Sequence, residues 1–320
     1  MQKISIVVSV YNEEKVLNKF YQAFEEIKKD LTWDYELIFV DDGSSDASSS
    51  MIREFASRDP KVRLIRLSRN FGHEAAMIAG IDRARGDAVI CMDADLQHPL
   101  ECIPEILLKL EEGYEVVNMV RTSNRSVGVF KNLFSRIFYK LLNRMQDQVS
   151  FEENASDYFA VSRRVADILK THYRERVRFL RGYVQSVGFR KTTIRYEAGN
   201  RAGGNTHYRF RKLVSFSIDT IMSFSDMPLK LGIYAGLACS LLGLIVLIYT
   251  LCTFRDAPSG YATIVILICF LFAILFVIIG VIGEYISVLF AELKDRPIYL
   301  VEEEMNFPDG PGEKDDLTVG

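Results

Sequence analysis

The sequence predicts an α/β protein with a mostly parallel, doubly wound sheet, followed by a membrane segment of two helices. In the N-terminal part, short apolar runs alternate with segments whose apolar residues recur at helical spacing, which is the pattern of βαβ units. In the C-terminal part, two long runs are almost free of charge. A chain of 320 residues is long enough for one medium domain and such a segment.

Each predicted strand is a short apolar run bounded by turn residues. Five such runs stand at residues 4–10, 35–40, 62–67, 87–92 and 116–119. Apolar residues at helical spacing predict helices at 16–27, 73–84 and 103–110. Because strands and helices alternate, we expect parallel strands with helices packed on the sheet.

Polar clusters follow three of the predicted strands: YNEE after the first, DDGSSD after the second and DADLQ after the fourth. The carboxyl ends of parallel strands meet at one edge of a sheet, where ligands bind. In the last cluster a period of two places Asp93, Asp95 and Gln97 on the same side. Three oxygen ligands suit Mg²⁺ or Mn²⁺, although an isolated Asp-x-Asp is also typical of a solvated turn.

Two nearly uncharged stretches predict a transmembrane hairpin. Residues 229–253 carry one charge, at their start, and residues 261–283 carry none. A helix of about 20 residues spans the roughly 30 Å of bilayer hydrocarbon, and both stretches are long enough. The turn between them, 254–260, has one cation, whereas the outer flanks are basic. The positive-inside rule therefore predicts that both flanks and residues 1–208 are cytoplasmic.

Composition excludes some partners and sites. The net charge of −3 gives no indication of a nucleic-acid partner. The five cysteines follow neither zinc-ligand nor disulfide spacing, so we expect them to be small apolar fillers.

The chain resembles the family 2 glycosyltransferases of GT-A fold in an ordered set of features: YNEE, DDGSSD, the run SRNFGHEAAMIAGIDRARGDAVICMDADLQHP and the two C-terminal spans. Within that family it is similar to the polyprenyl-phosphate glycosyltransferases, such as bactoprenol glucosyltransferases and dolichyl-phosphate mannose synthases, over about residues 3–300. It departs from the family pattern at four places. Ser9 stands where Pro is usual, His73 and His207 where Lys is common, and SDYFAVSRR at 156–164 where bactoprenol enzymes often have GDFRL.

The resemblance implies four parts of the chain. They are a cytoplasmic GT-A catalytic domain at 1–208, an amphipathic juxtamembrane helix at 209–227, two transmembrane helices at 228–290 and a cytoplasmic tail at 291–320. Apolar residues that alternate with cations after Tyr208 support a helix lying in the membrane interface. The protein is then expected to be an integral, multi-pass protein of the bacterial cell membrane.

The resemblance also implies roles for the three polar clusters. Tyr11, Glu13 and Asp42 would line the nucleoside pocket, and Asp41 would help orient the base. Two alternatives stay open, since Tyr11 also suits core packing, and Asp41 or Asp46 also suits a helix cap. The metal ion, Mg²⁺ or Mn²⁺, and through it the donor diphosphate would be held by Asp93, Asp95 and Gln97.

Cations and hydroxyls follow the fifth predicted strand and open the next helix. Such groups near a helix N-terminus can form a phosphate-binding site. In dolichyl-phosphate mannose synthases, which the chain resembles, this region binds the lipid phosphate. Arg121, Lys131 and Ser135 best match that pattern, with Arg125 and Arg136 as substitutes. A basic face toward solvent or membrane is the alternative interpretation.

A glycine-containing segment at 200–208 resembles the family's Arg-x-x-Gly-x-Ser-Lys-Tyr motif. Arg201 would reach the donor diphosphate, and the glycines would let the loop close over it. The alternative is a flexible linker before the membrane.

The implied reaction is metal-dependent transfer of a sugar, with inversion, from a nucleotide diphosphate sugar to polyprenyl (undecaprenyl) phosphate, for cell-envelope glycan modification. The donor would be a UDP-linked hexose or N-acetylhexosamine. The ion and Arg201 would stabilise charge on the leaving diphosphate. A phosphate acceptor has a second pKa of about 6, so it needs a general base less than a hydroxyl does. Asp95 or Asp157 would orient or deprotonate it.

Three other functions compete, and the sequence favours none of them. A polysaccharide synthase would need a Gln-x-x-Arg-Trp segment, but the single tryptophan is Trp33. A non-catalytic nucleotide-sugar-binding scaffold would not need the full carboxylate set. A transporter would need ionisable residues within its spans, where only Glu284 stands at an end. Finally, the tail at 296–301 reads as an exposed strand able to pair with a neighbouring subunit, which predicts a homo-oligomer.

Overall fold

The computed structural model describes residues 2–122, 155–175, 179–197, parts of 232–248, 260–294 and 296–307. The chain forms two compact units. The first consists of Met1–Ile137, Val149–His207 and Pro297–Gly320, and the second of Phe138–Gln148 and Tyr208–Arg296. Each unit is described by itself below.

One eight-stranded sheet forms the centre of the first unit, in the order β7-β5-β6-β4-β1-β2-β3-β8. The strands are β1 Lys3–Val10, β2 Asp34–Asp41, β3 Val62–Leu67, β4 Ala88–Asp93, β5 Val116–Arg121, β6 Ala155–Ser162, β7 Lys191–Tyr196 and β8 Val301–Met305. β1 is parallel to β2 and β4, β2 to β3, and β5 to β7, whereas β6 and β8 are antiparallel to their neighbours. The predicted mostly parallel α/β sheet is therefore confirmed.

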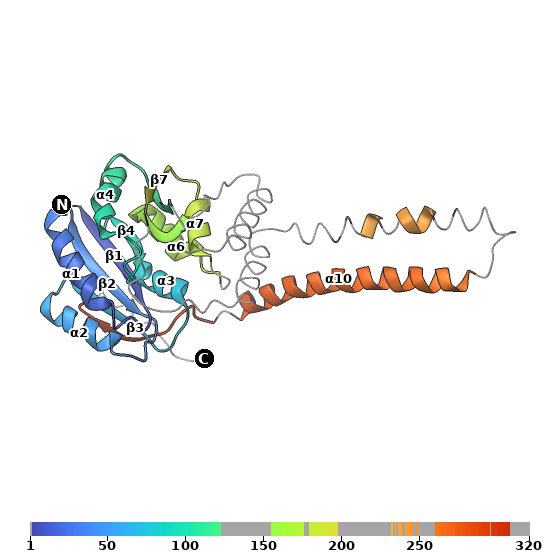
Figure 1. Cartoon of the computed structure of the whole chain (residues 1–320), viewed down its shortest axis with the longest axis horizontal. Helices are drawn as coiled ribbons and strands as arrows, with labels where there is room; N and C mark the ends of the chain where they lie inside the picture. The colour runs from blue at the N-terminus through green and yellow to red at the C-terminus, as the bar shows by residue number, and fades with distance from the viewer. Residues whose placement is uncertain are drawn as a thin grey trace. The chain divides into compact units, whose positions relative to one another are not determined.

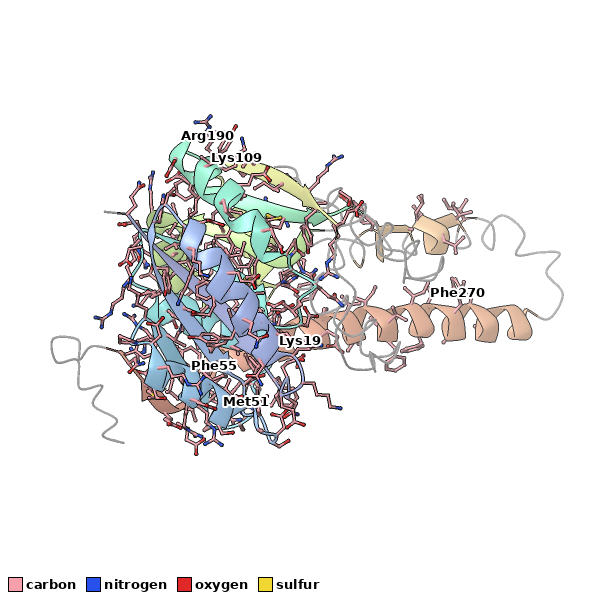
Figure 2. The ribbon with its side chains drawn as sticks, turned by 60° about the vertical axis from the view of Figure 1, so that its left-hand side comes forward. Lys19, Met51, Phe55, Lys109, Arg190 and Phe270 are labelled. Carbon is pink, nitrogen blue, oxygen red and sulfur yellow. The ribbon has the colours of Figure 1, made fainter. Side chains whose placement is uncertain are left out.

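Helices cover both faces of this sheet (Figure 1). They are α1 Leu17–Ile27, α2 Ser48–Arg58, α3 His73–Arg83, α4 Ile103–Glu111, α6 Arg163–His172 and α7 Leu180–Ser186. The residues of β1 alternate between the two faces, as the two-residue period of a strand requires. On one face, Phe39 of β2 packs against Phe20 of α1, with ring centroids 5.9 Å apart, and against Phe55 of α2 at 6.2 Å. Figure 2 labels Phe55 on α2, one turn from Met51.

On the other face, α3 approaches the sheet closely. A Cβ atom on Gly80 would lie 2.1 Å from Val7 Cγ1, so only glycine allows this spacing. The close approach fixes the start of α3, at His73, near the carboxyl end of β1. The helix therefore carries its first residues to the sheet edge where the polar clusters gather.

The tail strand is placed differently from the prediction. The expected strand at 296–301 is replaced by β8 at Val301–Met305, which pairs with β3 of its own chain. Ser68 N–H also donates to the Leu300 carbonyl over 2.9 Å. The strand satisfies its hydrogen bonds within the chain, so the exposed strand was a wrong prediction. The homo-oligomer inferred from it stays a prediction without that support.

The second unit contains α10, Tyr261–Leu293, a helix of 33 residues. At 1.5 Å per residue it is about 50 Å long, more than a bilayer's hydrocarbon thickness. Its section Phe270–Phe290 has a mean hydropathy of 2.4 and no buried residues, and within the described residues no other helix is long and apolar enough to cross a membrane. Phe270, labelled in Figure 2, is 54% exposed. The helix is ten residues longer than the predicted 261–283, because the prediction ended before the first charged residue, Glu284, and the helix continues through it.

Other predictions for this unit lie outside the described residues. These are the amphipathic helix at 209–227 and much of the first span at 229–253. The two-helix hairpin therefore stays a prediction.

Candidate active site

The carboxyl ends of β1, β2 and β4 bring the three polar clusters together. In the sheet register, Val10 of β1 lies opposite Asp41 of β2, and Ser9 of β1 lies opposite Asp93 of β4. The loops that follow the three strands therefore start at neighbouring positions on one edge. This is the convergence expected for a ligand site in an open α/β sheet.

The first loop is held to the second by hydrogen bonds. Ser44 Oγ accepts from Asn12 N–H over 2.9 Å, and Asn12 Oδ1 accepts from Ser45 N–H over 2.8 Å. Asn12 has φ +55°, which turns the chain sharply between Tyr11 and Glu13. Tyr11 is 48% exposed, so the alternative that it packs in the core is wrong. Its ring is accessible at the site edge.

Asp42 connects the second loop to the segment before α3. Its two carboxylate oxygens accept from Phe71 N–H over 2.7 Å and Gly72 N–H over 2.9 Å. Burial raises the pKa of the Asp42 carboxyl above its ordinary value, although these two N–H groups oppose the shift. Next to it, Gly43 has φ +69°, and a Cβ there would lie 2.5 Å from the Arg69 carbonyl carbon. The glycine thus permits the close contact of the two loops that Asp42 stabilises.

Asp41 differs from Asp42 because only one of its two carboxylate oxygens has a hydrogen-bond partner in the described residues. Its Oδ1 accepts from Ser44 N–H over 2.9 Å. Its Oδ2 is buried and has no hydrogen-bond partner among the described residues. The nearest cation is Arg66, whose Nε lies 3.8 Å away and is itself buried without a hydrogen-bond partner in the same part of the chain. Asp41 does not cap α2, since Asp46 accepts from the first residue of that helix, Ser48, over 2.9 Å.

Asp93 lies in a cluster of polar side chains at the end of β4. Ser9 Oγ donates to Asp93 Oδ1 over 2.9 Å and lies 2.9 Å from His73 Nδ1. His73 Nδ1 is 3.4 Å from the same carboxylate oxygen. Ser9 and His73, two of the departures from the family pattern, are therefore in direct contact with each other. The Asp93 N–H donates to His98 Nδ1 over 3.0 Å, which holds the start of the next turn.

Asp95 and Gln97 form the turn that follows β4. Asp95 Oδ1 accepts from Gln97 N–H over 3.0 Å, and Leu96 between them has φ +61°. Within the described residues, no three His, Cys, Asp or Glu side chains come together as a metal centre. Mg²⁺ does not require such a cage, because it is commonly held by one or two carboxylates, with water and substrate phosphate completing its shell. The oxygens of Asp93, Asp95 and Gln97 fit that kind of site.

Asp157 of β6 completes the cluster from the antiparallel side. Its carboxylate oxygens lie 3.3 Å from Arg181 Nε and 3.8 Å from His73 Nε2. Burial alone would raise the pKa of Asp157, but Arg181 and then His73 lower it below its ordinary value. Asp157 therefore stays ionised at neutral pH and is a poor proton acceptor.

Glu74 was missed from the sequence. Burial and then the charge of Asp157 raise the pKa of Glu74 to about 7, and its Oε2 accepts from Leu180 N–H over 2.8 Å. The only available signal was its position beside His73 at the start of α3. A protonated Glu74 links α3 to the first residue of α7 without adding a second charge beside Asp157.

Arg121, one of the predicted acceptor-site cations, ends β5 at the same edge. Its Nε donates to Tyr196 Oη over 3.1 Å, and its Nη2 lies 3.3 Å from His98 Nε2. His98 in turn contacts the backbone of Asp93, so Arg121 is separated from the Asp93 cluster by one side chain. The other predicted phosphate ligands lie outside the described residues: Arg125, Lys131, Ser135, Arg136 and Arg201.

Comparison with known proteins identifies the family. The profile described as "Glycosyl transferase family 2" matches residues 5–214, and the profile "GtrB C-terminal hairpin" matches residues 227–289. The glycosyltransferase YkcC of Bacillus subtilis (strain 168), described as uncharacterized, is 41% identical over 302 residues, which is 93% of each chain. The prophage bactoprenol glucosyl transferase homolog of Escherichia coli (strain K12) is 36% identical and covers 94% of this chain and 98% of its own. The chain thus belongs to glycosyl transferase family 2, with a GT-A-like α/β fold, and it is a glycosyltransferase.

Proposed function

We propose that the protein transfers a sugar from a nucleoside diphosphate sugar to a polyprenyl phosphate at the cytoplasmic face of the membrane. The observation that carries this proposal is the edge formed by β1, β2 and β4. Asp41, with one buried oxygen that lacks a hydrogen-bond partner in the described residues, ends β2, and the carboxylate cluster of Asp93 ends β4, on the two sides of β1. The bactoprenol glucosyl transferases among the relatives support the same acceptor class.

The unused groups of Asp41 and Arg66 support a nucleotide donor. A buried acceptor and a buried N–H donor 3.8 Å apart both lack a hydrogen-bond partner in the described residues, which is costly unless a ligand supplies one. A base edge that carries an N–H beside a carbonyl satisfies both groups. Uracil has such an edge, since its imide N–H lies between two carbonyls. We therefore favour a UDP-linked hexose or N-acetylhexosamine as the donor.

Mg²⁺ or Mn²⁺ held by Asp93, Asp95 and Gln97 would stabilise the negative charge that develops on the departing diphosphate. The protein's own residues keep this site in place. Ser9 and His73 orient the Asp93 carboxylate, and the Asp95–Gln97 hydrogen bond shapes the turn. Because these side chains are fixed before substrate binds, little reorganisation is needed during the reaction.

The acceptor side is supported by Arg121. Its guanidinium is held by Tyr196 near the Asp93 cluster, where it can contact an anionic phosphate. A lipid phosphate is largely ionised at pH 7, so the chemistry does not need a strong general base. The lowered pKa of Asp157 agrees with this, and we assign Asp157 to orientation of the acceptor rather than to proton removal. Asp95 is then assigned to the donor side, where it would help hold the metal ion that stabilises the diphosphate.

The topology of the sheet supports a multi-pass membrane protein. Residues before and after the membrane segment belong to one sheet, because β8 pairs with β3. Both flanks must then lie on the same side of a membrane, so any crossing by α10 needs a second crossing before it. The hairpin profile over residues 227–289 agrees with two spans, and the basic flanks favour the cytoplasm for the catalytic unit.

The test is transfer by the full-length protein in detergent. A panel of UDP-sugars would be incubated with undecaprenyl phosphate and Mg²⁺, and the lipid product identified by mass. We expect one donor to add a single hexose or N-acetylhexosamine to the lipid phosphate, and the activity to vanish with chelator. Equal glycosylation of free polyprenol would refute the phosphate acceptor. Nucleotide binding without any transfer would favour the scaffold function.

A further inference from the structure

The strand that follows the membrane segment, β8, pairs with β3, whose Arg66 lies opposite Asp41 of β2. Side-chain hydrogen bonds fix the chain to the rest of the first unit on both sides of β8. Tyr299 Oη donates to Asp82 Oδ2 over 2.7 Å just before the strand. Asn306 Nδ2 donates to the carbonyls of Ala56 and Val62, over 2.6 and 2.8 Å, just after it. These anchors hold the strand in a defined register beside β3.

The register of β8 contains a bulge at the point nearest Asp41. Arg66 of β3 lies opposite Glu303, whereas the next residue, Leu67, lies opposite Val301, so Glu302 is the extra residue. A bulge of this kind changes the direction of a side chain relative to a regular strand. The Glu302 carboxylate lies 3.2 Å from Arg66 Nη1. Arg66 is thus held at one end by Glu302, while its Nε faces the unused Asp41 oxygen.

The neighbouring glutamates of β8 have other partners. Glu303 pairs with Arg53 of α2 over 2.6 Å, and Glu304 pairs with Arg83 of α3 over 2.7 Å. Glu304 therefore forms the same kind of ion pair as Glu302, on the same strand, without contacting Arg66. The chain thus contains a matched control for Glu302.

We propose that β8 is a working part of the donor site, in which Glu302 positions Arg66 so that Arg66 and Asp41 together bind the edge of the nucleotide base. Glu302 is a positioning residue, since it acts through Arg66. The proposal rests on the nucleotide donor proposed above. It adds that residues beyond the membrane segment set the affinity for the base part of the donor.

The experiment measures binding of UDP and of inorganic pyrophosphate to the full-length protein in detergent with Mg²⁺, by titration calorimetry. Glu302→Gln should raise the Kd for UDP by about three- to fivefold, the range of a partly exposed ion pair, and leave pyrophosphate binding unchanged. Glu304→Gln should change neither ligand. A general loss of stability would instead weaken the binding of both ligands in both variants.

A second measurement tests whether the effect passes through Arg66. Arg66→Ala should raise the Kd for UDP more than Glu302→Gln does. Adding Glu302→Gln to Arg66→Ala should not change the Kd for UDP further, as expected for coupled residues. Equal UDP affinities of Glu302→Gln and Glu304→Gln would overturn the proposal, and so would an additive double variant. If the wild-type protein transfers sugar while Glu302→Gln binds UDP normally, the proposed function stands and this inference fails. A wild-type protein that binds no UDP would overturn both.

Discussion

Two carboxylates of the same strand, Glu36 at the start of β2 and Asp41 at its end, are both fully buried but differ in how they are satisfied. Glu36 Oε1 accepts from Ser5 Oγ over 2.5 Å and from Arg85 N–H over 2.6 Å, and Oε2 lies 2.7 Å from Lys3 Nζ and 2.8 Å from Arg63 Nη1. Asp41 has one bonded oxygen and one that is unused. Both Glu36 Oε2 and Asp41 Oδ2 are buried without a hydrogen-bond partner in the described residues, so the difference lies in their ion pairs. Glu36 Oε2 has two cations at 2.7 and 2.8 Å, whereas the nearest cation to Asp41 Oδ2 is 3.8 Å away. A closely ion-paired carboxylate suits a structural role, and a weakly paired one suits the binding of a ligand.

The largest expected effect is on stability, at Glu36, the closely ion-paired carboxylate. Burial alone would raise the pKa of Glu36, but Lys3, Ser5, the Arg85 N–H and Arg63 lower it below its ordinary value, so Glu36 is ionised. Glu36→Gln leaves cations without a counter-charge, and removal of one partner of a buried pair costs about 3–5 kcal/mol. The single tryptophan, Trp33, lies in the catalytic unit, so its fluorescence reports urea unfolding of that unit. An unchanged unfolding midpoint would show that Glu36 is not a structural carboxylate.

The next effect is on turnover, at the site edge of β4. Asp95→Asn removes an anionic ligand where charge develops, and loss of one such group commonly lowers turnover about 100-fold or more. Asp87→Asn is the control, because Asp87 Oδ2 accepts from Lys3 N–H over 2.8 Å beside the opposite end of the same strand. Transfer to undecaprenyl phosphate is measured for both variants. Equal activities would separate Asp95 from the chemistry.

Glu74 adds a third kind of carboxylate, one that is partly buried and whose pKa is raised into the neutral range. Its pKa of about 7 in the folded protein lies above its ordinary 4.5, so the folded state binds this proton more tightly than the unfolded state. The stabilisation is complete below about pH 4.5 and is lost as the pH rises through about 7. Between pH 5 and pH 8 the wild-type protein should lose about 2–3 kcal/mol that Glu74→Gln does not lose. Parallel pH profiles of urea unfolding for the two proteins would contradict this.

The sequence predicted those parts of the molecule that depend on local pattern. β1 to β4 end where apolar runs give way to YNEE, DDGSSD, the turn after Leu67 and DADLQ, so the carboxylates at the sheet edge could be placed in advance. Sheet order could not, because β6 and β8 pair with strands far away in the sequence. The segment VEEEM of β8 has no apolar alternation, and it is a strand because β3 offers it an edge.

The side-chain contacts within the site could not be predicted from the sequence either. Ser9 and His73 were noted as departures from the family pattern, but only the register of β1 against β4 and the close packing of α3 bring them together. Arg66 reads as an ordinary polar residue of a strand until Asp41 lies beside it. Pairwise contacts across a fold follow from packing, which no window of neighbouring residues describes.

The smallest expected effect sharpens the opening comparison most directly. Asp41→Asn keeps the size of the side chain and can still accept from Ser44 N–H, and no cation is left without an ion pair, since Arg66 remains paired with Glu302. The free energy of unfolding should therefore change by less than about 1 kcal/mol, in contrast to Glu36→Gln. The Kd for UDP should rise about tenfold, because a charged acceptor contributes roughly 1.5–3 kcal/mol to a hydrogen bond. Both quantities are measured on the same full-length preparation. A large loss of stability with normal UDP binding would make Asp41 a second structural carboxylate, and the distinction between the two ends of β2 would not hold.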